Sequence, residues 1–123
     1  MKKYGKKQRT RSQIGKSSRE RGKRGEREVV HLLRSHGYEA RRGQQFQGSP
    51  DSPDVISNFH DCHIEVKRTE TLSLYKAMEQ AKEDASEEQR PIVFHKRNGK
   101  EWLIVMEAEE MFKLLHSLML NDI

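Results

Sequence analysis

This chain of 123 residues has a single cysteine and lacks long apolar runs and a recognisable secretion signal. Cys62 is its only cysteine, which excludes an internal disulfide bond and fits a reducing compartment. No apolar run approaches the length of a membrane span and no signal peptide is recognisable, so we expect a cytoplasmic protein without a membrane partner. With 35% charged residues and a mean hydropathy of −1.02, the chain is expected to be water-soluble and to form one domain.

Acidic residues are nearly missing from the first 25 positions, where eleven lysines and arginines accompany one glutamate and give a net charge of +10. The other residues include 13 basic and 18 acidic ones and carry a net charge of −5. Few apolar residues interrupt the basic segment, so we expect it to be disordered in isolation. Its charge density favours a polyanion such as nucleic acid as its partner. A solubility tail and a transit peptide are the alternatives, although the segment lacks the apolar stripe of a transit peptide.

Hydrophobic periodicity and turn residues predict eight elements in the order helix, three strands, helix, two strands, helix. Gly37 is expected to follow the end of the first helix, Ser73 to cap the second, and Asn98-Gly99 to form a hairpin turn. The sequence therefore predicts an α/β fold with a mixed central β-sheet flanked by helices. We expect helices from Arg19 or Gly25 to 36, over about 73–85 and over 108–118, and strands over 38–42, 54–57, 63–67, 92–96 and 101–106.

One predicted strand, His63-Ile64-Glu65-Val66-Lys67, carries an acid and a lysine on the same face, because side chains alternate along a strand. Asp54 begins the neighbouring strand and can reach the same space. Close carboxylates repel each other, and a divalent cation relieves this repulsion; a set of oxygen ligands suits Mg²⁺ or Mn²⁺. Lys67 would then lie beside a metal-bound water. The alternative is that Glu65 and Lys67 form an ordinary surface pair.

The first helix contributes a further acid, Glu26. At 100° per residue, Glu26 lies about 40° from the mean direction of the apolar side chains, whereas Glu28 lies about 120° away. We therefore expect Glu26 to point inward, where an acid requires a cation. A stabilising interaction with the helix dipole is the alternative, but it would serve either glutamate equally.

These motifs together resemble the PD-(D/E)xK nuclease superfamily, and more closely the archaeal-type Holliday junction resolvases with their phage-encoded relatives. The resemblance rests on GKRGEREVVHLLRSHGY at 22–38, on Pro53-Asp54-Val55-Ile56 and on Ile64-Glu65-Val66-Lys67. It implies a restriction-endonuclease-like core and a structure-specific endonuclease acting in a prokaryotic or phage-infected cell. On this basis we assign residues 1–20 to a flexible basic arm and residues 21–123 to the nuclease domain.

The resemblance also implies roles for single residues. Glu26, Asp54 and Glu65 are expected to bind the metal, and Lys67 to assist the nucleophilic water. Gln80 is expected to approach the site from the second helix. The residues expected to contact DNA are Arg42, Ser49, Gln80, Lys23, Arg24 and Arg68. Nucleases for other branched or nicked DNA, and a non-catalytic DNA-binding protein on the same fold, remain alternatives.

Symmetric resolution of a four-way junction needs two cuts, so a homodimer is expected. The apolar side of the last helix, with Trp102 and Ile104, would supply the interface; these residues would otherwise be core. The run His60-Asp61-Cys62-His63 resembles a zinc motif, but two further ligands at suitable spacing are missing. His63 shares the strand face of Glu65 and is expected near it.

Overall fold

The computed structural model describes residues 10–43 and 53–121, and within this part the expected order of elements is confirmed. Five strands form one sheet in the order β1-β2-β3-β4-β5. Neighbouring strands are antiparallel except β3 and β4, which are parallel and are joined through α2. The elements are α1 (Arg11–Ser35), β1 (Ala40–Arg42), β2 (Val55–Ser57), β3 (Cys62–Arg68), α2 (Leu74–Asp84), β4 (Arg90–Lys96), β5 (Leu103–Val105) and α3 (Ala108–Asn121).

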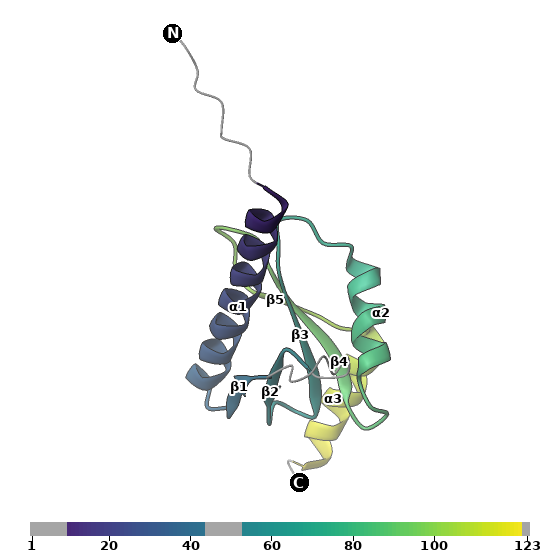
Figure 1. Cartoon of the computed structure of the whole chain (residues 1–123). Coiled ribbons are helices and arrows are strands. Elements are labelled where there is room, and N and C mark those ends of the chain that lie inside the picture. Colours follow the sequence, from purple (N-terminus) through teal and green to yellow (C-terminus); the bar gives the residue numbers. More distant parts are fainter. Residues whose placement is uncertain (1–9, 44–52, 122–123) are drawn as a thin grey trace.

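Helices α1 and α2 cover opposite faces of the sheet (Figure 1). On one face, α1 packs against β1, β2 and β3 around a core that includes Val29, Ile64 and Val66. On the other face, α2 packs against β3 and β4 through Ala81 and Val93. Because Glu65 is the register partner of Val93, the odd-numbered side chains of β3 face α2. None of the described helices is long and apolar enough to cross a membrane.

Helix α1 begins earlier than the periodicity indicated. It starts at Arg11, so residues 11–20, half of the proposed basic arm, are helical and continuous with the packed part of α1. Arginine, lysine, glutamine and glutamate are good helix formers, and an apolar stripe is not needed to extend a helix that is already anchored at its other end. The division into an arm and a nuclease domain stays a prediction.

Two glycines determine local geometry around α1. Gly37 has a φ of +89°, which confirms its expected place after the end of the helix. Gly25 lies where α1 crosses β3, and a Cβ atom there would be 2.9 Å from the Cβ of Arg68 and 3.3 Å from a methyl carbon of Val66. The absence of a side chain at Gly25 thus lets α1 approach the central strand β3 closely, one residue before Glu26.

The strands near the chain's end differ from their predicted bounds. β5 has only three residues, and the connection from β4 runs over residues 97–102 rather than over a two-residue turn. Asn98-Gly99 still makes the bend: Gly99 has a φ of +72°, and the N–H of Lys100 donates to the carbonyl of Arg97 at 3.1 Å. Trp102 lies just before β5, and its indole N–H donates to Glu28 at 3.1 Å.

Candidate active site

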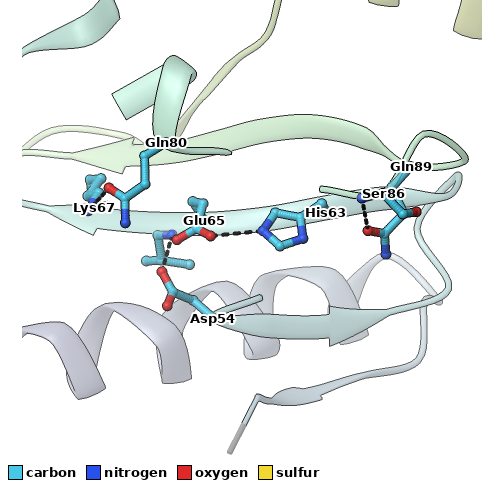
Figure 2. Close-up of polar contacts among 8 residues, drawn as sticks. Asp54, His63, Glu65, Lys67, Gln80, Ser86 and Gln89 are labelled. Atoms are coloured by element: carbon cyan, nitrogen blue, oxygen red, sulfur yellow. Dashed lines mark hydrogen bonds and ion pairs between the residues drawn. The ribbon is translucent and has the colours of Figure 1, made fainter. Parts of the chain in front are cut away.

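Residues from three parts of the chain come together beside the central strand β3. Asp54 lies just before β2, and its N–H donates to the carbonyl of Ile64 at 3.0 Å. Its side-chain Oδ2 accepts a 2.8 Å hydrogen bond from the N–H of Val66. Asp54 is therefore fastened to β3 at two points, in the stretch that contains Glu65. Figure 2 shows Asp54 reaching β3 beside Glu65, with Lys67 further along the strand and Gln80 of α2 directed towards it.

Asp54 has a raised pKa, and burial is the main cause. Burial and, to a lesser extent, the negative charge of Glu65 together raise the pKa of Asp54 from 3.8 to about 7, against the opposing effect of the Val66 hydrogen bond. The charge of Glu26 adds a smaller effect in the same direction. Both of the other expected metal ligands thus act electrostatically on Asp54.

Glu65 is a buried acid with a histidine partner. Its side chain is 5% exposed and that of His63 is 1% exposed, and His63 Nε2 lies 2.8 Å from Glu65 Oε1. Both project from the face of β3 that α2 covers, as the alternation along the strand indicated. This confirms that His63 lies beside Glu65, and it rules out the reading of Glu65 as an exposed surface acid.

Lys67 continues the same face of β3 towards solvent. Its Nζ donates a 3.3 Å hydrogen bond to Oε1 of Gln80, which comes from α2 (Figure 2). Gln80 therefore lies next to Lys67, because α2 packs back against the strand that it follows in the chain. Exposed Gln80 thus holds Lys67, to which the resemblance assigns the nucleophilic water.

Glu26 is half-buried on α1 and is paired with Arg42 of β1 at 3.1 Å. Both line a hollow of about 420 Å³ that reaches Asp54. Its basic lining comes from Arg42, Lys23 and Arg19. Arg19 was missed by the sequence reasoning, although its position four residues before Lys23 puts the two side chains on one side of α1.

The structure brings two of the three acids together more closely than the third. Within residues 10–43 and 53–121, Glu26, Asp54 and Glu65 do not form a group whose oxygens all lie within 4.8 Å of one another. The reason is the layering of the fold: α1 covers one face of the sheet, whereas the Glu65 side chain projects from the other. Asp54, just before β2, lines the hollow with Glu26 and is bonded to the strand that carries Glu65.

The contrast drawn between Glu26 and Glu28 was too strong. Glu28 is also half-buried, at 29% exposure against 19% for Glu26. It pairs with Arg68 at 3.2 Å and with Lys96 at 3.7 Å. The cations that attract Glu28 come from β3 and β4. The periodicity of apolar residues along α1 could therefore not predict that Glu28 points inward.

The expected DNA contacts occupy different environments. Lys23 lines the hollow and Arg24 is exposed on α1. Arg68 is only 11% exposed, and its guanidinium is engaged by Glu28 and by the side chain of Asn98 at 3.0 Å. This favours a structural role for Arg68 in holding α1 to the sheet. Ser49 lies outside the described residues.

A mixed sheet whose central strand carries Glu65 and Lys67, with Asp54 bonded beside them, defines an α/β nuclease. The description "archaeal Holliday junction resolvase (hjc)" belongs to the family whose model matches residues 17–120. The chain therefore belongs to the archaeal Holliday junction resolvase (Hjc) family, a family of structure-specific, junction-resolving nucleases, and the resemblance seen in the motifs is confirmed.

A solved structure supports this assignment. The chain is similar to Hjc, a Holliday junction resolvase from the archaeal hyperthermophile Archaeoglobus fulgidus, with 26% sequence identity and a TM-score of 0.55. The similarity covers 68% of this chain and 73% of that one. No match is found among curated proteins.

Proposed function

We propose that this protein hydrolyses phosphodiester bonds at four-way DNA junctions with the help of Mg²⁺ or Mn²⁺ held by Asp54, Glu65 and Glu26. The observation that carries the proposal is the pair of carboxylates formed by half-buried Asp54 and buried Glu65, in which the charge of Glu65 disfavours a second negative charge on Asp54 in the absence of a cation. Hard carboxylate oxygens are the ligands that Mg²⁺ and Mn²⁺ prefer. When bound, the cation supplies Lewis-acid stabilisation of the negative charge that develops on the phosphate.

Lys67 is the residue that we assign to the nucleophilic water. Its hydrogen bond to Gln80 holds the amino group near the acids instead of leaving it free in solvent. An ammonium group held there orients the water and stabilises charge on the phosphate as the bond to the water oxygen forms. The products are a 5′-phosphate and a 3′-hydroxyl, as the resemblance implies.

Arg42 and Glu26 couple DNA binding to assembly of the acid set in this proposal. Without DNA, the two side chains neutralise each other at 3.1 Å. A DNA phosphate competes for Arg42, because a guanidinium forms two parallel hydrogen bonds with phosphate oxygens. When a phosphate takes Arg42, Glu26 is released towards Asp54.

Two basic hollows that share Arg42 give the DNA path. The first holds Arg19 and Lys23, and the second, of about 470 Å³, continues across α1 and β1. We propose that phosphates of one DNA arm follow these hollows, with Arg24, Ser49 and the basic arm adding further contacts. The second hollow is lined by Arg27, Val30, His31, Arg34, Arg41 and Arg42.

A two-fold dimer would place two such sites for paired cuts. Helix α3 has no buried residue, and its apolar side chains, together with Leu103 and Ile104 of β5, are exposed. This exposure supports an interface there, whereas Trp102 packs against the core through Phe94 and does not belong to it. We expect the dimer to act in the cytoplasm.

The test compares a four-way junction with a linear duplex of the same arm sequence, each with Mg²⁺ and with EDTA. We expect paired cuts in the junction, only with Mg²⁺, and none in the duplex. Glu65→Gln is the matched inactive control, since it keeps the shape of the side chain and removes its charge. Equal cutting of junction and duplex would exclude junction selectivity. Binding of the junction without any cutting would identify a non-catalytic DNA-binding protein.

A further inference from the structure

A second group of metal-ligating side chains lies behind the proposed catalytic acids. One ring nitrogen of His63, one carboxylate oxygen of Glu65 and one of Asp84 all lie within 4.8 Å of one another. His63 and Glu65 project from β3, and Asp84 is the last residue of α2, so the packing of this helix against the sheet creates the group. His63 and Glu65 are buried, and Asp84 is half-buried.

The protein itself leaves this group incompletely satisfied. Among the described residues, no hydrogen bond or ion pair reaches the carboxylate of Asp84. The Nδ1 atom of His63 is also buried without a partner in this part of the chain. A carboxylate without a partner beside a second, buried carboxylate is unfavourable unless a cation binds there. Figure 2 shows one His63 nitrogen directed at Glu65 and the other directed away from it.

The 2.8 Å separation of His63 Nε2 and Glu65 Oε1 requires a proton or a cation between them, because a nitrogen lone pair and a carboxylate repel each other. A proton neutralises only one of the two acids. A divalent cation neutralises Glu65 and Asp84 together. Since Nδ1 has no protein partner that fixes its protonation, the ring can carry its proton there and present Nε2 as a ligand.

We propose that His63, Glu65 and Asp84 form a second cation site, selective for a divalent first-row transition metal such as Mn²⁺ or Co²⁺. Ligand atoms about 2.0–2.3 Å from an ion are roughly 3–4.5 Å from one another, which agrees with the observed spacing. Imidazole nitrogen is a ligand for such metals, whereas Mg²⁺ prefers oxygen alone. Cys62 takes no part, because it packs in the core on the α1 face.

Glu65 would be shared between this site and the proposed catalytic cation, because its carboxylate contacts His63 and also influences Asp54. This bridging depends on the proposed function, whereas the set of His63, Glu65 and Asp84 stands on its own geometry. Binding of the metal at Nε2 displaces the proton now held between His63 and Glu65, which then leaves to solvent or moves to Nδ1.

The test counts bound ions on the full chain after removal of metals with EDTA, by Mn²⁺ titration followed with electron paramagnetic resonance. We expect two Mn²⁺ ions per unaltered chain and one in Asp84→Asn. The matched control is Glu83→Gln, which removes an acid from the adjacent exposed position of α2 and should keep two ions. The same number of ions in Asp84→Asn as in the unaltered chain would overturn the second site.

Two further variants separate this inference from the proposed function. Asp54→Asn should lose only the catalytic ion, and Glu65→Gln should lose both. Unchanged binding in Asp54→Asn combined with loss of one ion in Asp84→Asn would refute the catalytic cation and leave the second site standing. Addition of Co²⁺ gives an independent readout, since coordination by His63 should shift and broaden its ring resonances in the NMR spectrum. Asp84→Asn should abolish that shift while its circular dichroism stays unchanged, and persistence of the shift would contradict the assignment of Asp84.

Discussion

The carboxylate of Asp54 accepts a 2.8 Å hydrogen bond from the backbone N–H of Val66, so an acid that lies just before β2 is fixed against the central strand β3. The bond stabilises the charged carboxylate, yet burial and the charge of Glu65 outweigh it and raise the pKa of Asp54 to about 7. The site therefore holds Asp54 in place at a cost in stability that a cation can relieve.

The raised pKa of Asp54 predicts a specific dependence of stability on pH. The folded protein binds this proton more tightly than the unfolded chain, whose aspartate has a pKa near 3.8. Without metal, the free energy of unfolding should therefore fall as the pH rises from about 4 to 7, by a few kcal/mol at most. Asp54→Asn should remove this fall and be more stable than the unaltered protein at pH 8. Urea denaturation in EDTA at pH 4.5 and pH 8 measures the difference.

The same experiment with Mg²⁺ supplies the control. The cation should stabilise the unaltered protein at pH 8, because it binds the folded state alone, and should have a smaller effect on Asp54→Asn. An Asp54→Asn variant that is less stable than the unaltered protein at pH 8 in EDTA would show that the carboxylate is not under strain.

The contact between α1 and β3 predicts opposite effects at two glycines. Gly25→Ala places a methyl group 2.9 Å from the Cβ of Arg68 and should destabilise the protein by about 1–3 kcal/mol, because overpacking exceeds the gain in helix propensity. Gly22→Ala, one turn earlier, meets no atom within 4 Å and should stabilise by about 0.5–1 kcal/mol. Urea denaturation of both variants tests this pair, and equal effects would refute the close packing at Gly25.

Much of this architecture was accessible from the sequence, for a physical reason. The side-chain period of β3 placed His63, Glu65 and Lys67 on one face, and Gly37 marked the end of α1, since both depend only on local geometry. Contacts between distant segments were not accessible. The pairing of Glu28 with Arg68, and the approach of Asp84 to His63, arise only when helices pack on the sheet, and no periodicity encodes them.

Lys67 provides the sharpest separation of catalysis from binding. Lys67→Ala should reduce junction cleavage by about 10²-fold or more, because the group that orients the water is lost. Binding of the junction should change little, since the basic hollows lined by Arg19, Lys23 and Arg42 are intact. The matched control is Lys82→Ala on α2, whose exposed amino group pairs with Glu107 away from β3. Gel-shift and single-turnover cleavage assays measure both quantities, and full cleavage by Lys67→Ala would refute the assignment.

The exposed apolar side of α3 predicts how the paired cuts are achieved. Phe112 and Leu115 are 62% and 48% exposed, so Phe112→Asp with Leu115→Asp should leave the fold intact while introducing charge into the proposed interface. We expect the unaltered chain to sediment as a dimer and the double variant as a monomer. Lys113→Asp alters charge on the same helix without removing apolar surface and should stay dimeric. On a junction, the monomer should cut single strands without coordinating the two cuts. A monomeric unaltered chain at every concentration would exclude this interface.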